Sequence, residues 1–370
     1  MTSAPSNSEP LRLSEKPTPP GGGSSVGSLR IGILGAARIA QLAIVKPAQA
    51  TGTRLVTVAA RDRRRAEAFA TEHGVERTTD SYVAVLTDPE IEVVYNPLPN
   101  AFHGPWNLAA VQAGKHVLSE KPFASTAEEA TEVRDAAQKA GVTVVEGFHY
   151  LFHPVMQRLF ALVDAGELGE LQRVDALIAM PEPDDGDPRW SFDLAGGALM
   201  DLGCYGLHAQ RALGRWAGGE PELVDARAKE RAGAPGVDEW VEADLRFPSG
   251  ATGAVRCSMT NPRFEMTLRV EGSRGEATVM DFVQPHKDDR VVVRTGAGEA
   301  TEHLRTRSSY IYQLEGFIRA LRGGPPMPTG PDDAVATAQL IDQCYRAAGL
   351  PLRNRRTLTP TELRLPERRS

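Results

Sequence analysis

A lysine, a carboxylate and a phenol in this sequence form a set that could pass a proton to or from an alcohol oxygen. Lys121 directly follows a predicted strand. Asp201, Tyr205 and His208 are spaced so that one face of a helix would carry all three. A free tyrosine titrates at about 10 and a nearby ammonium stabilises its phenolate, so we expect Lys121 to lower the pKa of Tyr205. The simpler interpretation is a helix whose polar face meets water, with His208 as a structural histidine.

The segment 116–124 would hold Lys121 at the rim of a sheet. Its apolar strand ends just before the lysine, and Pro122 favours an extended backbone at the residue before it. Ligands of open parallel sheets bind outside the carboxyl ends of the strands. Two further segments, 96–100 and 146–150, also follow predicted strands and would reach the same rim, although each could be a rigid surface loop. They add Asn96, Pro97, Leu98, Asn100, His149 and Tyr150 to the candidate site.

A loop at residues 35–40 has the pattern of a dinucleotide-binding turn with two substitutions. The predicted strand Leu29–Leu34 runs into Gly-Ala-Ala-Arg-Ile-Ala and then a helix to about Ala50. Such a turn brings backbone N–H groups and a helix N-terminus close to a pyrophosphate. Alanine replaces the second and third glycines, which weakens the motif, and any strand–turn–helix unit could have this sequence. The loop residues expected to contact a cofactor are Gly35, Ala36, Ala37, Arg38 and Ile39.

The end of the second predicted strand, Leu55–Ala60, indicates which dinucleotide would bind. An NAD site usually has Asp or Glu there to bind the ribose 2′-hydroxyl. This chain has Ala60 followed by Arg61, which favours a 2′-phosphate and therefore NADP, with NAD as the alternative. The arginines at 63–65 are expected mostly to face solvent in the first turn of a helix.

The order of predicted strands and helices divides the chain into two folded parts after a tail. Residues 1–28 are rich in Ser, Pro and Gly and are predicted to be a disordered tail. From 29 to 150, strands alternate with single helices, among them a helix from Ser125 to Ala140 with Ser125 as N-cap, which predicts an α/β fold with a doubly wound parallel Rossmann sheet. From 151 to 370, strands follow one another with few helices between them, which predicts an α+β domain with a large, open, mostly antiparallel sheet. Its predicted strands are 172–180, 223–231, 237–247, 251–260, 264–271, 275–280 and 290–294, and helices at 309–321 and 332–348 end the chain.

Composition excludes several classes of protein. The 370 residues are 41% hydrophobic and 24% charged with a net charge of −6, which does not suit a nucleic-acid-binding protein. No apolar run has the length that a membrane span needs. The three cysteines, Cys204, Cys257 and Cys344, have no metal-ligand spacing, so we expect no metal site and a reducing, cytoplasmic location.

Three segments together resemble the Gfo/Idh/MocA oxidoreductases: the loop at 35–40, the Glu-Lys-Pro stretch within 113–122, and the Gly-Gly stretch at 196–205. The resemblance extends from Leu29 to about Arg353. It implies an N-terminal Rossmann domain that binds NAD(P), and a C-terminal sheet that joins copies of the chain into a dimer or tetramer. It also implies a small substrate: a sugar, a cyclic polyol or a diol.

The resemblance also implies roles for individual residues. Lys121 matches the lysine of Glu-Lys-Pro and Asp201 matches the aspartate after the glycine pair. Tyr205 stands where many members have histidine, as in the branch of glucose–fructose oxidoreductase and the dimeric dihydrodiol and xylose dehydrogenases, in which tyrosine is the proton donor. Departures from the family pattern are His208, where other members often carry Asp, and Leu151, where they often carry Arg. Glu120, Lys121 and His103 join the expected cofactor residues, and the expected substrate residues are His149, Tyr150, Trp190 and His208.

Three functions fit these residues. The first is an NADP-dependent enzyme that moves a hydride between nicotinamide and a carbinol or carbonyl carbon of a sugar, sugar derivative or cyclic diol, with Tyr205 as acid or base beside Lys121. The second is a non-enzymatic NADP-binding regulator on the same fold. The third is an enzyme that keeps its cofactor bound for net non-redox chemistry.

Overall fold

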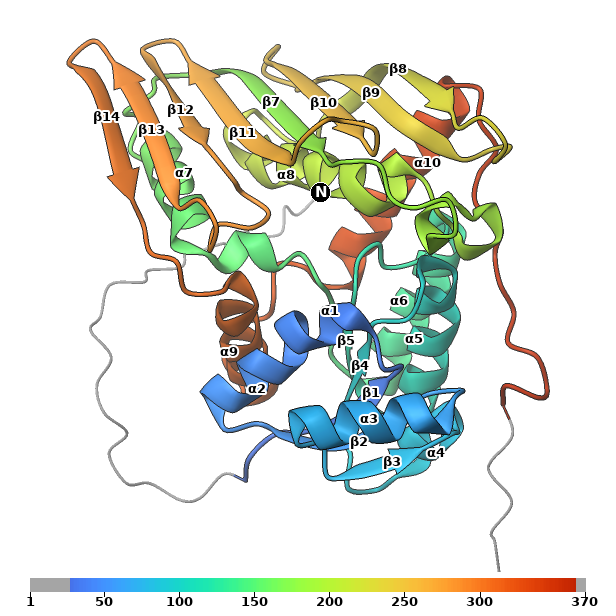
Figure 1. Cartoon of the computed structure of the whole chain (residues 1–370). Coiled ribbons are helices and arrows are strands. Elements are labelled where there is room, and N and C mark those ends of the chain that lie inside the picture. Colours follow the sequence, from blue (N-terminus) through green and yellow to red (C-terminus); the bar gives the residue numbers. More distant parts are fainter. Residues whose placement is uncertain (1–26, 364–370) are drawn as a thin grey trace, which may run out of the picture.

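The computed structural model describes residues 27–363 and contains two sheets, one above the other, with helices between and around them (Figure 1). The predicted tail lies outside the described residues except for its last two positions. Within residues 27–363, no helix combines the length and apolar character needed to cross a membrane.

The N-terminal sheet confirms the predicted doubly wound topology. Six strands pair in parallel in the order β3-β2-β1-β4-β5-β6. The strand β3 was not predicted, because three polar residues carry no alternating pattern. The strands are β1 (Arg30–Leu34), β2 (Arg54–Ala59), β3 (Arg77–Thr79), β4 (Val93–Asn96), β5 (His116–Ser119) and β6 (Val144–Glu146).

Helices cover both faces of this sheet. One face packs against the helical segment after β1, formed by α1 (Arg38–Ala40), a π turn η1 (Gln41–Val45) and α2 (Lys46–Thr51), with α3 and α9 beside it. The other face packs against α4, α5, α6 and the first half of α10. These further helices are α3 (Arg63–His73), α4 (Tyr82–Thr87), α5 (His103–Gln112), α6 (Ala127–Ala140), α9 (Ser309–Leu321) and α10 (Pro331–Ala347).

The predicted cap of α6 was wrong by one residue. Thr126, not Ser125, is the N-cap, and its hydroxyl oxygen accepts from the backbone N–H of Glu129 at 3.3 Å. Ser125 instead donates its backbone N–H to the carboxylate of Glu129 at 2.7 Å. Both residues can cap a helix, so the sequence alone did not separate them.

The C-terminal sheet is mostly antiparallel, as expected. Eight strands pair in the order β14-β13-β12-β11-β7-β10-β9-β8, and β7 with β10 is a parallel pair. The strand β14 was not predicted, because it is short and polar. The strands are β7 (Leu171–Ala179), β8 (Glu222–Glu230), β9 (Asp238–Arg246), β10 (Thr252–Ser258), β11 (Glu265–Gly272), β12 (Gly275–Val279), β13 (Arg290–Thr295) and β14 (Gly298–His303).

The inner face of this sheet packs on helices that lie between the two sheets (Figure 1). Alternation along the strands sends apolar side chains inward and charged ones outward, where Arg173, Asp175 and Arg269 belong to a set of ion pairs. The boundary at residue 150 stays a prediction, because α9 and α10 return to cover the N-terminal sheet. The inner layer contains α7 (Pro154–Asp164), α8 (Cys204–Leu213) and the end of α10, and short helical turns occur at η2 (Asn100–Phe102), η3 (His149–Phe152), η4 (Pro188–Trp190), η5 (Phe192–Leu194), η6 (Leu199–Gly203) and η7 (Gly214–Trp216).

Candidate active site

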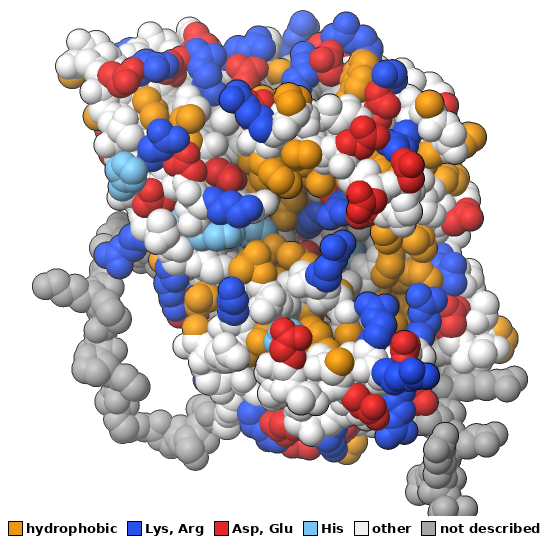
Figure 2. Space-filling view, in the orientation of Figure 1, with side chains coloured by type: hydrophobic (Ala, Val, Ile, Leu, Met, Phe, Trp, Pro, Cys, Tyr) orange, Lys and Arg blue, Asp and Glu red, His pale blue; other side chains and the backbone are white. Residues whose placement is uncertain are grey.

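A cleft of about 1070 Å³ lies where the carboxyl ends of the N-terminal strands meet the C-terminal part of the chain. The space-filling view shows this face hollowed between its upper and lower halves, with apolar and basic side chains gathered there (Figure 2). A second cavity of about 390 Å³ shares Ile39, Pro97, Asn100 and Asp201 with the cleft and reaches deeper. The two cavities are therefore continuous, with the deeper one at one end of the cleft.

The loop after β1 fits a dinucleotide despite its alanines. Gly35 has φ +97° and therefore needs to be glycine. Ala37 has φ −86°, an ordinary extended conformation, so alanine strains nothing there. Ala40 is fully buried under the sheet, where a small residue lets the helix approach closely. No side chain caps the helix at Ala37, so its N-terminus faces the cleft open to an anion, with residues 35–39 along the wall.

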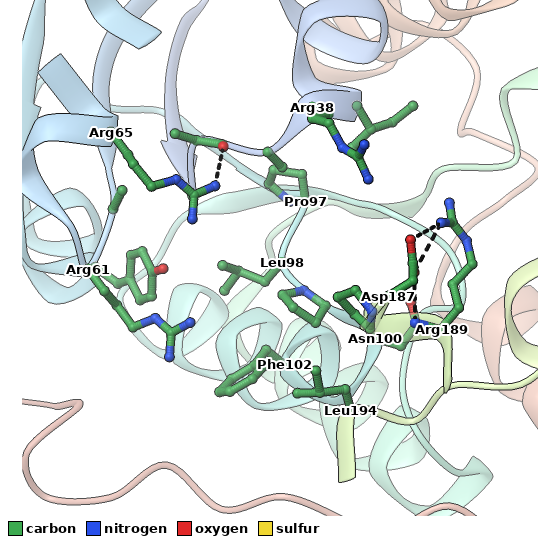
Figure 3. Close-up of a pocket in the computed structure, with 18 of the residues that line it drawn as sticks. Arg38, Arg61, Arg65, Pro97, Leu98, Asn100, Phe102, Asp187, Arg189 and Leu194 are labelled. Carbon is green, nitrogen blue, oxygen red and sulfur yellow. Dashed lines mark hydrogen bonds and ion pairs between the residues drawn. The ribbon is translucent and has the colours of Figure 1, made fainter. Parts of the chain in front are cut away.

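Arginines stand on one side of the cleft and an arginine–aspartate pair stands on the other (Figure 3). Arg65 donates to the carbonyl oxygen of Ala36 at 3.1 Å, which ties α3 to the loop after β1. Arg61 is exposed, lines the cleft, and forms no ion pair within the described residues. Arg189 and Asp187 face these arginines across the loop that contains Leu98.

The loop after β4 is held by buried polar groups. Asn96 is fully buried and does not line the cleft; it donates to the side chain of Asn107 at 2.9 Å. His103 lies 2.6 Å from the carbonyl oxygens of both Leu98 and Pro122, and burial lowers its pKa to about 4. These contacts link the β4 loop to the turn after Lys121, and the Lys121–Pro122 peptide bond is cis.

Lys121, Asp201 and Arg189 form a charged cluster where the two cavities join. The Lys121 ammonium donates to the backbone oxygen of Asp201 at 2.6 Å and to its carboxylate at 3.2 Å, and Arg189 donates to the other carboxylate oxygen at 2.7 Å. Burial alone would lower the pKa of Lys121, but the Asp201 carboxylate raises it above its ordinary value. Burial would likewise raise the pKa of Asp201, yet Lys121 and Arg189 lower it to about 2. All three groups therefore stay charged at neutral pH.

Tyr205 lines the deeper cavity beside this cluster, with the Lys121 ammonium 5.0 Å from the centre of its ring. The phenol oxygen lies 3.1 Å from Nε2 of His149, whose Nδ1 lies 2.8 Å from the hydroxyl of Ser309. Burial, reinforced by Tyr310 and Glu120, raises the pKa of Tyr205 well above its ordinary value. The expected lowering by Lys121 was wrong, because the lysine directs its charge at Asp201 and burial disfavours the phenolate.

Three residues expected near the substrate lie outside both cavities. Tyr150 is fully buried and its hydroxyl contacts Nδ1 of His208 at 2.7 Å. His208 continues this chain to the carboxylate of Asp333 at 3.0 Å, on the far side of α8. Trp190 donates its ring N–H to the Pro183 carbonyl oxygen at 3.2 Å. Of the four residues expected to contact substrate, His149 is the one that lines the deeper cavity.

The glycine pair before Asp201 is explained by a buried ion pair. A Cβ at Gly197 would collide with the side chains of Asp238 and Arg353, and one at Gly196 would meet the backbone of Arg189. Asp238 accepts from the backbone N–H of Leu199 at 2.6 Å and so caps the turn that carries Asp201. The glycines thus let a fully buried carboxylate and arginine position the start of η6.

Sequence reasoning missed Arg189 and Tyr310. Arg189 lies in a polar loop without periodicity, twelve residues from the Asp201 carboxylate that it binds. Tyr310 stacks on His149 with ring centres 3.7 Å apart, and it comes from a helix near the end of the chain. No local pattern marks either residue, because each acts through a contact made by folding.

Comparisons with known proteins agree with this architecture. The model of the oxidoreductase family with an NAD-binding Rossmann fold matches residues 29–148, and that of the GFO/IDH/MocA C-terminal domain matches 156–278. The chain is 35% identical over 323 residues to a D-xylose 1-dehydrogenase (NADP(+)) from Haloferax volcanii, covering 86% of this chain and 97% of that protein.

Two solved structures are similar throughout. One is a 3-ketoreductase from Actinomadura kijaniata in complex with NADP and TDP-benzene, with a TM-score of 0.79, 27% identity, and coverage of 87% of this chain and 98% of that one. The other is an aldose–aldose oxidoreductase from Caulobacter crescentus complexed with glycerol, with the same TM-score, identity and coverage.

Proposed function

Because the chain belongs to the Gfo/Idh/MocA family of NAD(P)-dependent oxidoreductases, we propose that it is an NADP-dependent enzyme acting on a hydroxyl or carbonyl carbon of a sugar or related polyol or diol. One observation carries the proposal. The Lys121 ammonium and the Tyr205 phenol line one cavity of about 390 Å³, and that cavity opens into a cleft whose loops fit a dinucleotide.

The bound nicotinamide would supply or accept the hydride, and the side chains of this chain handle the proton. Tyr205 is neutral because burial raises its pKa, so in the reducing direction its hydroxyl gives a proton to the substrate oxygen. Lys121 stays charged and stabilises negative charge on that oxygen in both directions. Asp201, fixed by Arg189, holds the lysine in place.

His149 orients the acid. Burial and the Lys121 charge lower the pKa of His149 well below its ordinary value, so the ring is neutral. With its proton on Nε2, it donates to the Tyr205 oxygen and accepts from the Ser309 hydroxyl at Nδ1, which leaves the Tyr205 O–H free to donate to the substrate. Both ring nitrogens are then satisfied, and the phenol oxygen is fixed at the cavity wall.

The preference for NADP rests on charge at the end of the cleft away from Lys121. Arg61 follows β2, where a carboxylate would otherwise select NAD, and Arg65 lines the same wall. Neither arginine has an ion-pair partner within the described residues, so both are available to a 2′-phosphate. The proposed cofactor residues are Gly35, Ala36, Ala37, Arg38, Ile39, Arg61, Pro97, Leu98, Asn100, His103 and Glu120.

We further propose that two or more copies associate through the outer face of the C-terminal sheet, in the cytoplasm. That face carries alternating arginines and carboxylates, such as Arg256 with Asp244 at 2.7 Å, so it can meet a second copy of itself with matched charge. Light scattering behind a sizing column should give a mass above that of one chain, and a single-chain mass at all salt concentrations would contradict the association.

The function is tested by titrating purified protein with NADPH and NADH, followed by a panel of sugars, polyols and diols monitored at 340 nm. We expect tighter binding of NADPH and turnover of a sugar or diol. Tight binding without turnover across the panel would favour the regulator or the enzyme with permanently bound cofactor. No binding of either dinucleotide would contradict all three functions.

A further inference from the structure

The segment after α10 runs back along the N-terminal part of the chain beside α6 (Figure 1). Its start is fixed by Arg353, whose guanidinium is buried against Asp238 and the carbonyl oxygen of Gly196. Arg355 then forms ion pairs with Glu128 at 2.5 Å and Glu132 at 2.6 Å, both on α6. These contacts lead the segment toward the cleft.

The next residue, Arg356, turns into the cleft. Its guanidinium lies 4.0 Å from the ring centre of Phe102, and it donates to Glu362 at 3.1 Å. Glu362 also accepts from the backbone N–H and the hydroxyl of Thr359, at 2.8 and 2.9 Å. Nε of Arg356 is buried and has no hydrogen-bond partner among the described residues. The structure thus holds a cation on the cleft wall, stacked on one side and only partly paired.

A side cavity of about 300 Å³ opens beside Arg356. Arg61, Tyr82 and Phe102 line it, and all three also line the main cleft. Thr361 and Glu362 of the C-terminal segment form its outer wall. Aromatic rings and a guanidinium plane are the surfaces on which a flat aromatic base stacks. The cavity lies at the Arg61 end of the cleft, away from Lys121, where the adenosine half of a dinucleotide would lie.

We propose that residues 356–362 are part of the cofactor site: Thr361 and Glu362 close a pocket for adenine, and Arg356 binds a phosphate of the adenosine half. The inference rests on the proposed NADP-dependent function and adds a part of the chain more than 200 residues beyond the Rossmann strands. The adenosine phosphates are the diphosphate and the 2′-phosphate, and both present the same anionic oxygens to a guanidinium.

The test compares two variants with a charge-matched control. Arg356→Gln removes the cation, and a chain ending after Asn354 removes the wall while keeping the buried Arg353. Arg346→Gln removes an exposed charge on α10 that does not line the cleft. Calorimetric titration with NADPH, 2′,5′-ADP and ADP should show about tenfold weaker binding of NADPH and 2′,5′-ADP by both variants, and the control should stay within about twofold of the parent chain.

The ADP titration identifies the phosphate. If Arg356→Gln weakens binding of 2′,5′-ADP but not of ADP, Arg356 binds the 2′-phosphate. If it weakens binding of 2′,5′-ADP and ADP equally, Arg356 binds the diphosphate. Both results support the inference. If the parent chain binds NADPH and Arg356→Gln binds NADPH and 2′,5′-ADP equally well with an unchanged melting temperature, the inference is overturned and the proposed function stands. If the parent chain itself fails to bind NADPH, the proposed function fails first. Arg356→Gln keeps the chain intact, so it decides the matter even where the shortened chain does not fold.

Discussion

Two carboxylates beside the short turn η6 behave differently: Asp238 binds the first residue of the turn, and Asp201 lies within it. Asp238 and Arg353 have fully buried side chains, and Tyr345 and the backbone of Leu199 complete a closed set of partners. Asp201 also has two cationic partners, but its side chain remains 17% exposed and lines both cavities. Burial and pairing of charge therefore do not by themselves mark an active site. The Lys121–Asp201–Arg189 cluster differs from the Asp238–Arg353 pair because one of its faces is open to the cavities.

Breaking the Asp238–Arg353 pair should have the largest effect, which is a loss of stability. Arg353→Met leaves the Asp238 carboxylate buried without its partner, which costs about 3–5 kcal/mol in the free energy of unfolding. Urea denaturation measures this loss. The double variant Arg353→Met with Asp238→Leu should recover part of it, because no buried charge remains. A loss below about 1 kcal/mol in the single variant would show that the Asp238–Arg353 ion pair does not stabilise the fold.

Breaking the cluster of Lys121, Asp201 and Arg189 at Lys121 should lower turnover and leave stability largely unchanged. Lys121→Met removes the group that stabilises charge on the substrate oxygen, and we expect turnover to fall at least about a hundredfold. The melting temperature should change little, because Arg189 still pairs with Asp201. Steady-state assays at saturating cofactor measure the loss, and near-normal activity would remove Lys121 and its cluster from the mechanism.

Acid should remove the contribution of Asp201 to the stability of the fold over a defined range of pH. The pKa of Asp201 is about 2 in the folded chain, below its unfolded value of about 3.9, so its ionised form stabilises the fold above that unfolded value. The contribution, about 2 kcal/mol, should be lost as the pH falls from about 5 toward 2. The difference in unfolding free energy between the parent chain and Asp201→Asn should shrink over this range. A difference that stays constant over this pH range would mean that Lys121 and Arg189 do not lower the pKa of Asp201.

The smallest effect is expected at Arg61, which has no carboxylate partner among residues 27–363. Arg61→Ala should weaken the binding of NADPH by about tenfold and the binding of NADH much less, since one charge-assisted contact to the 2′-phosphate is lost. Fluorescence titration with both dinucleotides measures the two constants. Equal loss for both would contradict the argument for NADP.

The sequence predicted those parts of the site that follow strands. Lys121 and the loop at 35–39 were placed correctly, because strand ends in a parallel sheet share one rim. Tyr150 was expected at the same rim, but it is fully buried. His208 was expected on the helix face of Asp201 and Tyr205, but helical spacing does not say which way a face turns, and α8 directs His208 toward Asp333. Arg189, Tyr310 and Arg356 were not predicted, because they reach the cavities from segments distant in the chain.

The same limit applies to the fold: local sequence patterns predicted the two sheet types, but not the contacts between distant segments. Alternating strand and helix patterns identify a doubly wound sheet, and successive strands identify an antiparallel one. The parallel pairing of β7 with β10 joins strands that are not neighbours in the sequence, so no local pattern indicates it. Nor does local pattern reveal that α9 and α10 pack back against the N-terminal sheet.

Asp201 lies in a π turn, η6, and a second π turn, η1, follows the loop after β1. A π turn is equivalent to one residue inserted into an α-helix, and each residue of an α-helix rotates the chain by about 100°. Deleting a single residue within Leu199–Gly203 would therefore give a longer regular helix whose start points about a quarter turn away. The carboxylate would leave Lys121 while Tyr205 stayed in place. In evolutionary terms, a change of length in this stretch would separate the catalytic groups, so natural relatives with the same chemistry should keep its residue count.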